Sequence, residues 1–344
     1  MSLTVERLDV RLARAVDRYV LTHPRGTPFH ETRWLDLVRT CFDFETRTLV
    51  ASEGHELRGV LPLGLVSAPI TGRRLVSVPY GVYGGILASD PEAIGALDEA
   101  CQLLARREHV RFVELRYLGE GISDHASASI HETYRKELPE TPDEVLGTIP
   151  RKARAEVRKA RNRHEMTFVS SPDLFEDFYE LYCLNKRSLG SPVFRRSYFR
   201  KLLDLYGHRG LLHAVVQGDT VVAAVLSLTA GRVIYPYYSG AAPEATRMGA
   251  NNALYAGLME EAVRLGFRTF DFGRSRIDSG PAAFKQHMGF EPTELDYQFF
   301  FPHGGKPPKI NPGNPKMALP RRVLSSLPMW AARAVGPSVM RHVP

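Results

Sequence analysis

The sequence is poor in cysteine, and it has no long apolar run. Three cysteines occur in 344 residues, at Cys41, Cys101 and Cys183, and no two of them form a CxxC pair. This pattern predicts reduced, buried thiols and excludes a disulfide framework or a cysteine-based zinc site. The first residues carry charges throughout, and no stretch approaches the roughly eighteen uncharged apolar residues of a membrane span. We therefore expect a cytoplasmic protein.

The signatures of three common enzyme classes are also missing. The sequence contains no GxSxG turn, no HExxH helix and no GxxxxGK[ST] loop. These patterns build a serine nucleophile elbow, a zinc site and a phosphate-binding loop, respectively. We expect no metal site and no tightly bound cofactor.

The composition is that of a globular protein with a basic surface. Hydrophobic residues make up 44% and charged residues 24%, which is typical of a folded chain rather than a disordered one. The length suits two domains. The formal charge of +7 is concentrated rather than uniform, which suggests an anionic partner such as phosphate, nucleic acid or a lipid headgroup. A merely soluble basic surface is the alternative.

A weak internal repeat begins with two hairpins. Apolar residues flank a polar turn at Gly54 in the segment 48–63, and the same pattern surrounds Gly218 in 211–226. A third strand is expected after each hairpin, at 75–78 and at 232–238. The two halves of the chain therefore start their sheets in the same way.

Three further elements follow in each half. They are a glycine-rich loop, an amphipathic helix and a last strand. Their ranges are 80–85, 91–107 and 109–116 in the first half, and 239–249, 250–265 and 267–274 in the second. We predict that a β-β-β-loop-α-β unit occurs twice, although an α/β chain can show a similar order by chance.

Helices and a linker complete the predicted organisation. Helices are expected before the first hairpin at 31–40 and before the second at 173–188 and 197–206. The fold class that follows is α/β (α+β), with two tandem lobes that each contain a mixed sheet flanked by helices. We place the lobes at 1–140 and 141–301, joined by the proline-containing connector 139–142.

A strongly basic helix is expected after Pro150. The segment 151–163 contains seven cations and one acid, and Ala153, Val157 and Ala160 give it a narrow apolar stripe. Like charges on one helix face repel each other by a few tenths of a kcal/mol per pair, and a bound anion would compensate for this repulsion. We therefore predict that this face contacts phosphate or RNA. A solvated helix face is the alternative. The arginines on this face are Arg151, Arg154, Arg158 and Arg161.

An ordered set of short motifs resembles the FemAB-like proteins of the GNAT acyltransferase superfamily, especially those associated with exosortase and PEP-CTERM systems. The resemblance covers most of the chain. Its motifs are Pro28-Phe29, Trp34-Leu35, Tyr83-Gly84-Gly85, the helix 150–163, Tyr238 to Ala245, Gly249-Ala-Asn-Asn-Ala-Leu-Tyr255, Phe270-Asp-Phe-Gly-Arg-Ser275, Phe284-Lys285 and Gly289-Phe290-Glu-Pro292.

The resemblance implies two GNAT-type lobes that form an amide bond. In cell-wall members of the family the donor is aminoacyl-tRNA and the acceptor is an amine of a peptidoglycan precursor, while other members use other acyl donors. We therefore expect an aminoacyl- or acyltransferase with aminoacyl-tRNA or acyl-coenzyme A as donor co-substrate. The expected acceptor is a small-molecule or lipid-linked amine related to the cell envelope or to exopolysaccharide.

One loop departs from ordinary acetyltransferases. Their diphosphate loop reads roughly Arg/Gln-x-x-Gly-x-Gly/Ala, with successive amides at a helix start. Here the loop runs from Arg247 through Gly249, which places the arginine one residue too close to the glycine. This departure weakens the expectation of coenzyme A.

The candidate site lies in the second lobe. Amide formation needs a proton acceptor and donors directed at the developing oxyanion. We assign catalytic roles to Tyr237 and Lys285, and to Asp271, which lies between two phenylalanines and could anchor a loop or orient the acceptor amine. The expected substrate-binding residues in this lobe are Ser239, Asn251, Arg274, Ser275 and Arg276, and the arginines suit a phosphate or a carboxylate.

The first lobe is expected to bind the acceptor. It has Glu114-Leu-Arg-Tyr where the second lobe has Asp271-Phe-Gly-Arg, so the second lobe should contribute more to transfer. Trp34, Tyr80 and Tyr83 are its candidate substrate contacts. A simple turn with packed aromatic rings explains the tyrosines nearly as well.

The tail, 302–344, is a proline-rich segment followed by short amphipathic helices. Val323, Leu324, Leu327, Met329 and Trp330, with Arg321, Arg322 and Arg333, could lie on an anionic membrane surface, which would make the protein peripheral to the inner membrane face. Packing on the second lobe is the favoured alternative.

Three functions remain open at this point. The leading one is a Fem-like transferase with charged tRNA as a candidate partner. The second is an N-acetyltransferase that uses acetyl-coenzyme A, and the third is a non-catalytic pair of lobes that binds RNA or an envelope partner. The displaced arginine argues against the second, and the polar series Asp271, Arg274 and Lys285 argues against the third. The oligomeric state is open.

Overall fold

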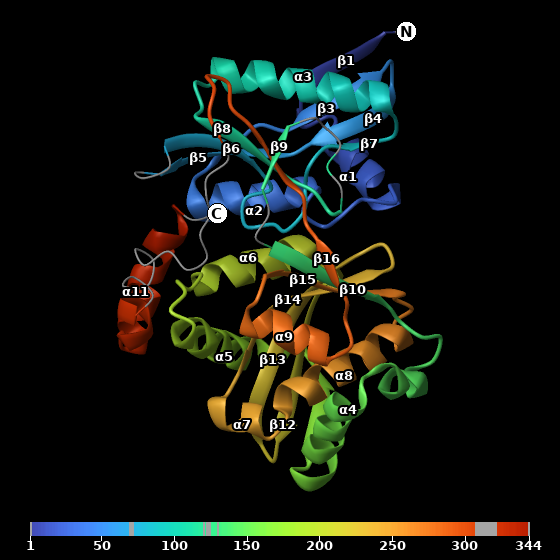
Figure 1. Cartoon of the computed structure of the whole chain (residues 1–344), viewed down its shortest axis with the longest axis vertical. Helices are drawn as coiled ribbons and strands as arrows, with labels where there is room; N and C mark the ends of the chain where they lie inside the picture. Colours follow the sequence, from blue (N-terminus) through green and yellow to red (C-terminus); the bar gives the residue numbers. More distant parts are fainter. Residues whose placement is uncertain are drawn as a thin grey trace. The chain divides into compact units, whose positions relative to one another are not determined.

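The computed structural model describes residues 2–68, 72–119, 121, 125–128, 131–306 and 322–342. The chain divides into two compact units. Unit 1 comprises Met1–Ile130, Glu294–Ile310 and Arg341–Pro344, and unit 2 comprises His131–Thr293 and Asn311–Met340. The outcome is a mixed α/β protein of two lobes, as the repeat predicts (Figure 1).

Unit 1 contains a four-stranded sheet, β1-β3-β4-β7, and a six-stranded sheet, β2-β5-β6-β8-β17-β9. Helix α3 packs on the first sheet and buries Leu97 and Cys101 against it. The elements are β1 (Leu3–Arg7), α1 (Ala13–Thr22), α2 (Thr32–Phe42), β2 (Glu45–Thr46), β3 (Leu49–Glu53), β4 (Glu56–Leu61), β5 (Leu63–Ala68), β6 (Gly72–Ser77), β7 (Leu87–Ala88), α3 (Pro91–Arg107), β8 (Phe112–Arg116), β9 (Ala126–Ser127) and β17 (Tyr297–Phe300).

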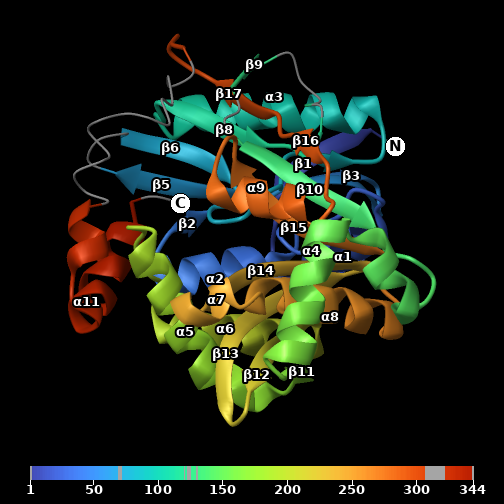
Figure 2. The same cartoon turned by 60° about the horizontal axis from the view of Figure 1, so that its bottom comes forward.

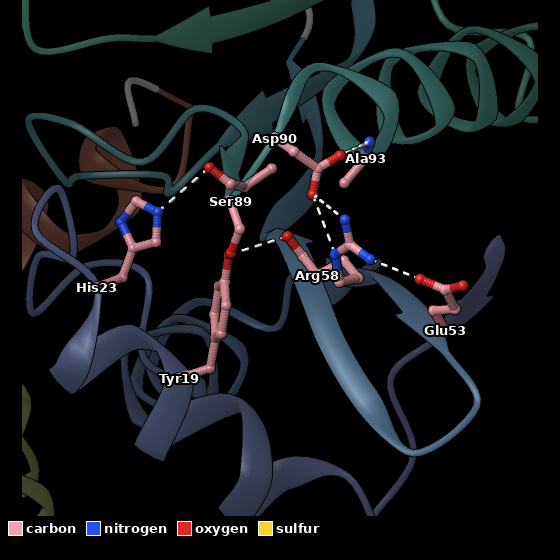
Figure 3. A network of polar contacts seen from close by, with 8 residues as sticks. Tyr19, His23, Glu53, Arg58, Ser89, Asp90 and Ala93 are labelled. Carbon is pink, nitrogen blue, oxygen red and sulfur yellow. Dashed lines mark hydrogen bonds and ion pairs between the residues drawn. The ribbon is translucent and has the colours of Figure 1, made fainter.

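A polar network fixes the start of α3 (Figure 3). The carboxylate of Asp90 caps the helix by accepting the Ala93 N–H at 2.9 Å, the usual role of aspartate at this position. Arg58 on β4 donates to the other oxygen of Asp90 at 2.8 Å and pairs with Glu53 at 2.5 Å. The hydroxyl of Tyr19 donates to the Arg58 carbonyl at 2.9 Å. Helix α1, the β3–β4 hairpin and α3 are therefore held together.

Unit 2 contains one seven-stranded sheet, β11-β12-β13-β14-β15-β10-β16. Helices α5 and α8 cover opposite faces of it (Figures 1 and 2). The elements are β10 (His131–Glu137), the 3₁₀ turn Pro142–Thr148, α4 (Arg151–Arg158), a π-helical turn at Lys159–Arg163, β11 (Met166–Ser170), α5 (Phe175–Ser188), α6 (Arg196–Tyr206), β12 (Gly210–Gln217), β13 (Thr220–Ala230), β14 (Val233–Ala241), α7 (Pro243–Arg247), α8 (Ala250–Arg264), β15 (Thr269–Arg276), α9 (Gly280–His287), β16 (Pro292–Glu294) and α11 (Met329–Met340).

The same topology occurs in both units. The hairpins turn at Gly54 and Gly218, which both have positive φ. In each unit a helix crosses from one strand to a parallel neighbour, β6 to β8 through α3 and β14 to β15 through α8. The continuous strand β13 of unit 2 corresponds to β4 and β5 of unit 1, which Pro62 separates.

In each unit, one strand of the parallel pair has a further, antiparallel neighbour that comes from the other half of the sequence. Strand β10 precedes all other elements of unit 2 and pairs antiparallel with β15. Strand β17 follows β15 in the chain but pairs antiparallel with β8 of unit 1. The lobe boundaries predicted at 140 and 301 therefore differ from the boundaries of the two units. Hairpin and helix periodicities do not indicate which distant strand will pair with the edge of a sheet.

The tail helix packs on unit 2, the favoured sequence interpretation. Helix α11 contacts α5, and Ala331 and Ala332 are buried there. Arg321 and most of the proline-rich segment lie outside the described residues. The thiols of Cys101 and Cys183 are buried as expected, while Cys41 is half-buried.

Candidate active site

The strands β14 and β15 separate soon after they meet. Their parallel ladder consists of two pairs, Val233↔Thr269 and Ile234↔Phe270. A β-bulge at Tyr237 interrupts the pairing of β14 with β13, because Leu226 opposes Tyr238 and Ser227 opposes Pro236. Regular strand alternation would place Tyr235, Tyr237 and Ser239 on one face, and that alternation stops at the bulge. The later residues of the two strands do not pair with each other, and the sheet opens between them.

Asp271 on β15 is a buried carboxylate with defined partners. Its side chain is 1% exposed. One oxygen accepts the Gly273 N–H at 2.7 Å, and the other lies 3.3 Å from Nε of Arg135 on β10. Burial of a charge is tolerated when it is paired in this way. Both carboxylate oxygens are engaged. Asp271 therefore holds the backbone of β15 at Gly273 and balances the charge of Arg135.

Lys285 on α9 clamps the same part of β15. Its ammonium donates to the carbonyls of Phe272, Gly273 and Arg274 at 2.9, 2.8 and 3.3 Å. Burial lowers the pKa of Lys285 to about 7, and the charge of Asp271 opposes that shift. The three bonds use all three ammonium hydrogens, so the geometry favours the charged form and a positioning role over that of a base.

Ser239 on β14 has a partner that sequence reasoning missed. The hydroxyl of Tyr255 on α8 donates to Ser239 Oγ at 2.9 Å. Ser239 therefore keeps its own hydrogen for a further acceptor. Tyr255 is part of the sequence motif Gly249 to Tyr255. Helical spacing, however, does not show which strand residue the Tyr255 side chain contacts.

The remaining candidates lie on the same elements. Arg274, Ser275 and Arg276 continue β15 beyond the bulged Gly273, which has φ +64°. Burial lowers the pKa of Lys186 on α5, and the positive charge of Arg274 lowers it further. These two cations are therefore near each other. Asn251 lies in the first turn of α8, but Gly249 is the N-cap residue, so Asn251 does not cap the helix.

The loop before α8 is packed against the basic helix. A Cβ on Gly249 would lie 2.7 Å from the Glu156 carbonyl oxygen of α4, and the φ of +91° also requires glycine. Lys159 donates to the Arg247 carbonyl at 3.3 Å. Gly249 and Ala250 are buried. Gly249 is thus packed closely against α4, next to the first turn of α8.

The basic helix differs from the prediction at its end. Ala153, Val157 and Ala160 are fully buried, as the apolar stripe predicted. The α-helix stops at Arg158, and the His164 N–H bonds the Lys159 carbonyl in a π turn. This wider turn carries Arg161 to α8, where two bonds of 3.0 and 2.9 Å join it to Glu260. Arg161 therefore does not share the exposed face of Arg151 and Arg158.

The candidates of unit 1 are core residues. Trp34 is 0% exposed and donates to the Pro79 carbonyl at 3.0 Å. Tyr80 stacks with Phe42 at 4.3 Å between ring centroids, and Tyr83 is 1% exposed. The amides of Gly84 and Gly85 bond the Arg116 carbonyl. The aromatic and glycine pattern thus builds a packed turn, and these residues support the fold of unit 1.

No cluster of three or more potential metal ligands occurs in the described part of the chain. Comparison with protein families matches residues 150–286 to the Acetyltransferase (GNAT) domain. This range begins at the N-cap of α4, ends within α9 and contains Asp271, Lys285 and Ser239. A search of curated proteins found no match.

Solved structures share the fold over both units. The crystal structure of FemX has a TM-score of 0.66 and 18% identity, covering 85% of this chain and 96% of that one. A tandem GNAT protein from the clavulanic acid biosynthesis pathway has a TM-score of 0.55 and 15% identity, covering 89% and 100%. The C-terminal domain of a putative lysylphosphatidylglycerol synthetase from Agrobacterium fabrum has a TM-score of 0.55 and 12% identity, covering 86% and 92%. The chain thus has a tandem GNAT-like fold, and the match over 150–286 supports an acyltransferase.

Proposed function

We propose that the protein is a Fem-like aminoacyl- or acyltransferase that forms an amide bond with an amine acceptor. The observation that carries the proposal is the opening of β14 and β15 after two ladder pairs, inside the range that resembles a GNAT domain. An open pair of parallel strands offers backbone donors and acceptors to an extended acyl donor. Hydroxyl and cationic side chains then surround the same opening.

The residues of unit 2 divide the chemistry among them. The acceptor amine attacks the acyl carbonyl, a C–N bond forms, and the ester or thioester bond of the donor breaks. Ser239, polarised by Tyr255, donates to the developing oxyanion. Tyr237 at the bulge gives a proton to the leaving oxygen or sulfur, and the proton that the attacking amine loses restores the Tyr237 hydroxyl. Asp271 and Lys285 hold β15, so that Arg274 and Arg276 are directed at an anionic group of a substrate.

Aminoacyl-tRNA is the donor that we favour. Arg247 lies one residue too close to Gly249 for the usual diphosphate loop, and the exposed cations of α4 suit a nucleic-acid backbone. The resemblance to FemAB-like proteins of exosortase and PEP-CTERM systems favours an acceptor amine of the cell envelope or of exopolysaccharide. Unit 1 is then the acceptor-binding lobe.

A donor comparison tests the proposal. Purified protein is offered charged tRNA or acetyl-coenzyme A with a panel of amines, and products are identified by mass spectrometry. The expected product is an aminoacylated amine that forms with charged tRNA and disappears with Lys285→Met, which removes the three bonds to the β15 carbonyls. Lys136→Met is the control, because Lys136 also donates to a carbonyl from inside unit 2 but lies outside the site.

Acetyl transfer is the second candidate, and the description of the matched family favours it. An acetylated amine formed only with acetyl-coenzyme A would replace the leading proposal with this one. Failure of both donors on every amine, with the fold intact by circular dichroism, would contradict both.

A further inference from the structure

Helix α11 has an inner face that fits unit 2 closely (Figure 1). A Cβ on Gly336 would lie 2.7 Å from the backbone nitrogen of Val193, so glycine is required there. Arg333 pairs with Glu180 of α5, and its guanidinium lies 5.5 Å from the Tyr179 ring centroid. The helix is therefore docked in a fixed orientation, and its other face is presented outward.

The exposed residues of α11 are apolar except for Ser338, and they include the most exposed aromatic side chain in the described part of the chain. Trp330 is 75% exposed and Val335 is 44% exposed, with Ala334 exposed between them. The second tryptophan of the chain, Trp34, is fully buried. Tryptophan is enriched where a protein meets the headgroup region of a bilayer, because its ring is apolar and its N–H is polar.

The charge of the protein is concentrated in the same C-terminal region. No aspartate or glutamate follows Asp296, and the basic residues after it equal the net charge of +7 of the whole chain. Beside α11, the acids Glu176 and Glu180 are paired with Arg196, Arg200 and Arg333. The basic residues after Asp296 are Lys306, Lys309, Lys316, Arg321, Arg322, Arg333 and Arg341, of which Arg333 pairs with Glu180 and Arg341 with Asp43.

We propose that the outer face of α11 docks on the surface of an anionic membrane, with Trp330 at headgroup depth. Basic segments are attracted to anionic lipids, and an apolar helix face adds the burial that fixes the contact. Among the described residues no helix has the length and apolarity to cross a bilayer, so the contact is interfacial. The inference does not depend on the proposed reaction.

Tryptophan fluorescence tests the docking directly. The full chain is titrated with vesicles of phosphatidylglycerol and phosphatidylcholine, and with vesicles of phosphatidylcholine alone. Because Trp34 is already buried, a blue shift on the anionic vesicles reports Trp330, and Trp330→Phe should abolish it. We expect co-sedimentation with anionic vesicles to weaken by about tenfold in Trp330→Ser and in high salt.

Val10→Ser is the matched control, since Val10 is a 92% exposed apolar residue of unit 1. It should co-sediment like the unchanged protein. Equal co-sedimentation of Trp330→Ser and the unchanged protein would overturn the inference. So would a blue shift that grows with protein concentration in the absence of lipid, because that result assigns the face to a second copy of the chain.

Discussion

Hydroxyl and ammonium groups in unit 2 are held in place before any substrate binds. Lys285 fixes three carbonyls of β15, and Tyr255 orients Ser239 on β14. Side chains fixed in this way lose little further freedom when the reaction begins, which is the physical basis of preorganised catalysis.

Tyr255→Phe tests the role of the Tyr255–Ser239 pair. We expect kcat to fall about tenfold with little change in KM, because the lost hydroxyl polarises a donor that acts on the oxyanion. Tyr179→Phe removes another buried tyrosine hydroxyl, which donates to the Phe194 carbonyl at 3.2 Å, and should keep full activity. Equal rates in the two variants would assign Tyr255 to packing alone.

His213 on β12 gives unit 2 a defined sensitivity to acid. It is 1% exposed, and neither ring nitrogen has a hydrogen-bond partner among the described residues. Burial lowers the pKa of His213 to about 4, below its ordinary 6.5. The folded state therefore binds fewer protons than the unfolded state, so its stability is full above pH 6.5 and falls as the pH drops toward 4.

His213→Leu should remove this sensitivity. The unchanged protein should lose about 2 kcal/mol of unfolding free energy through His213 between pH 7.5 and pH 5. The variant should show a shallower slope by that amount in urea unfolding followed by circular dichroism. Parallel pH profiles for the two proteins would show that the His213 ring is hydrated or paired.

The structure places the predicted residues of unit 2 on neighbouring elements, and it buries those predicted in unit 1 in the core. Asp271 could be recognised because a carboxylate between Phe270 and Phe272 needs a partner. Trp34, Tyr80 and Tyr83 have the composition of a binding surface, but their burial depends on tertiary packing that no local pattern encodes. The partner Arg135 lies on a strand from the other side of the linker, so spacing gave no signal for it.

At the scale of elements, periodicity predicted the long helices well. Helix α3 was expected at 91–107 and spans Pro91–Arg107, because its capping aspartate, proline and apolar spacing agree. The two-residue strands and β11 were not found, since such short segments hold too few residues for a pattern. The π turn after α4 was missed for the same reason.

The cations of α4 carry a prediction about nucleic acid, with Arg158 exposed and Arg154 half-buried. Arg154→Glu with Arg158→Glu reverses two charges one helical turn apart, so binding of tRNA at low salt should weaken by about tenfold or more, as measured by filter binding. Arg14→Glu with Arg18→Glu makes the same change at the same spacing on α1. Equal loss in both double variants would indicate a general effect of net charge and contradict a site on α4.

At the scale of the whole molecule, each unit depends on a strand that is distant in sequence. Strand β17 closes the edge of β8, and the Tyr297 hydroxyl donates to the Val82 carbonyl at 2.8 Å. The repeat predicted the shared order of elements. It could not predict this exchange, because no local pattern in β10 or β17 specifies which sheet edge the strand will join.

Two truncations isolate the contribution of β17. A chain that ends at Thr293 lacks β17, and a chain that ends at Gly305 retains it, while both lack α11. Hydrogen exchange should show lost protection of β8 only in the shorter chain, because an unpaired edge leaves its amides open to solvent. Intact protection of β8 in the chain that ends at Thr293 would contradict this dependence.

The exchange of β10 and β17 also sets an order for events on the ribosome. Strand β10 leaves the exit tunnel long before its partner β15 is made, and β8 waits for β17, which is made later still. Neither lobe can finish its sheet from a nascent N-terminal half. The two sheets are therefore completed close together in time, once β15 and β17 have emerged, and an open β8 edge is the segment that chaperones would have to shield until then.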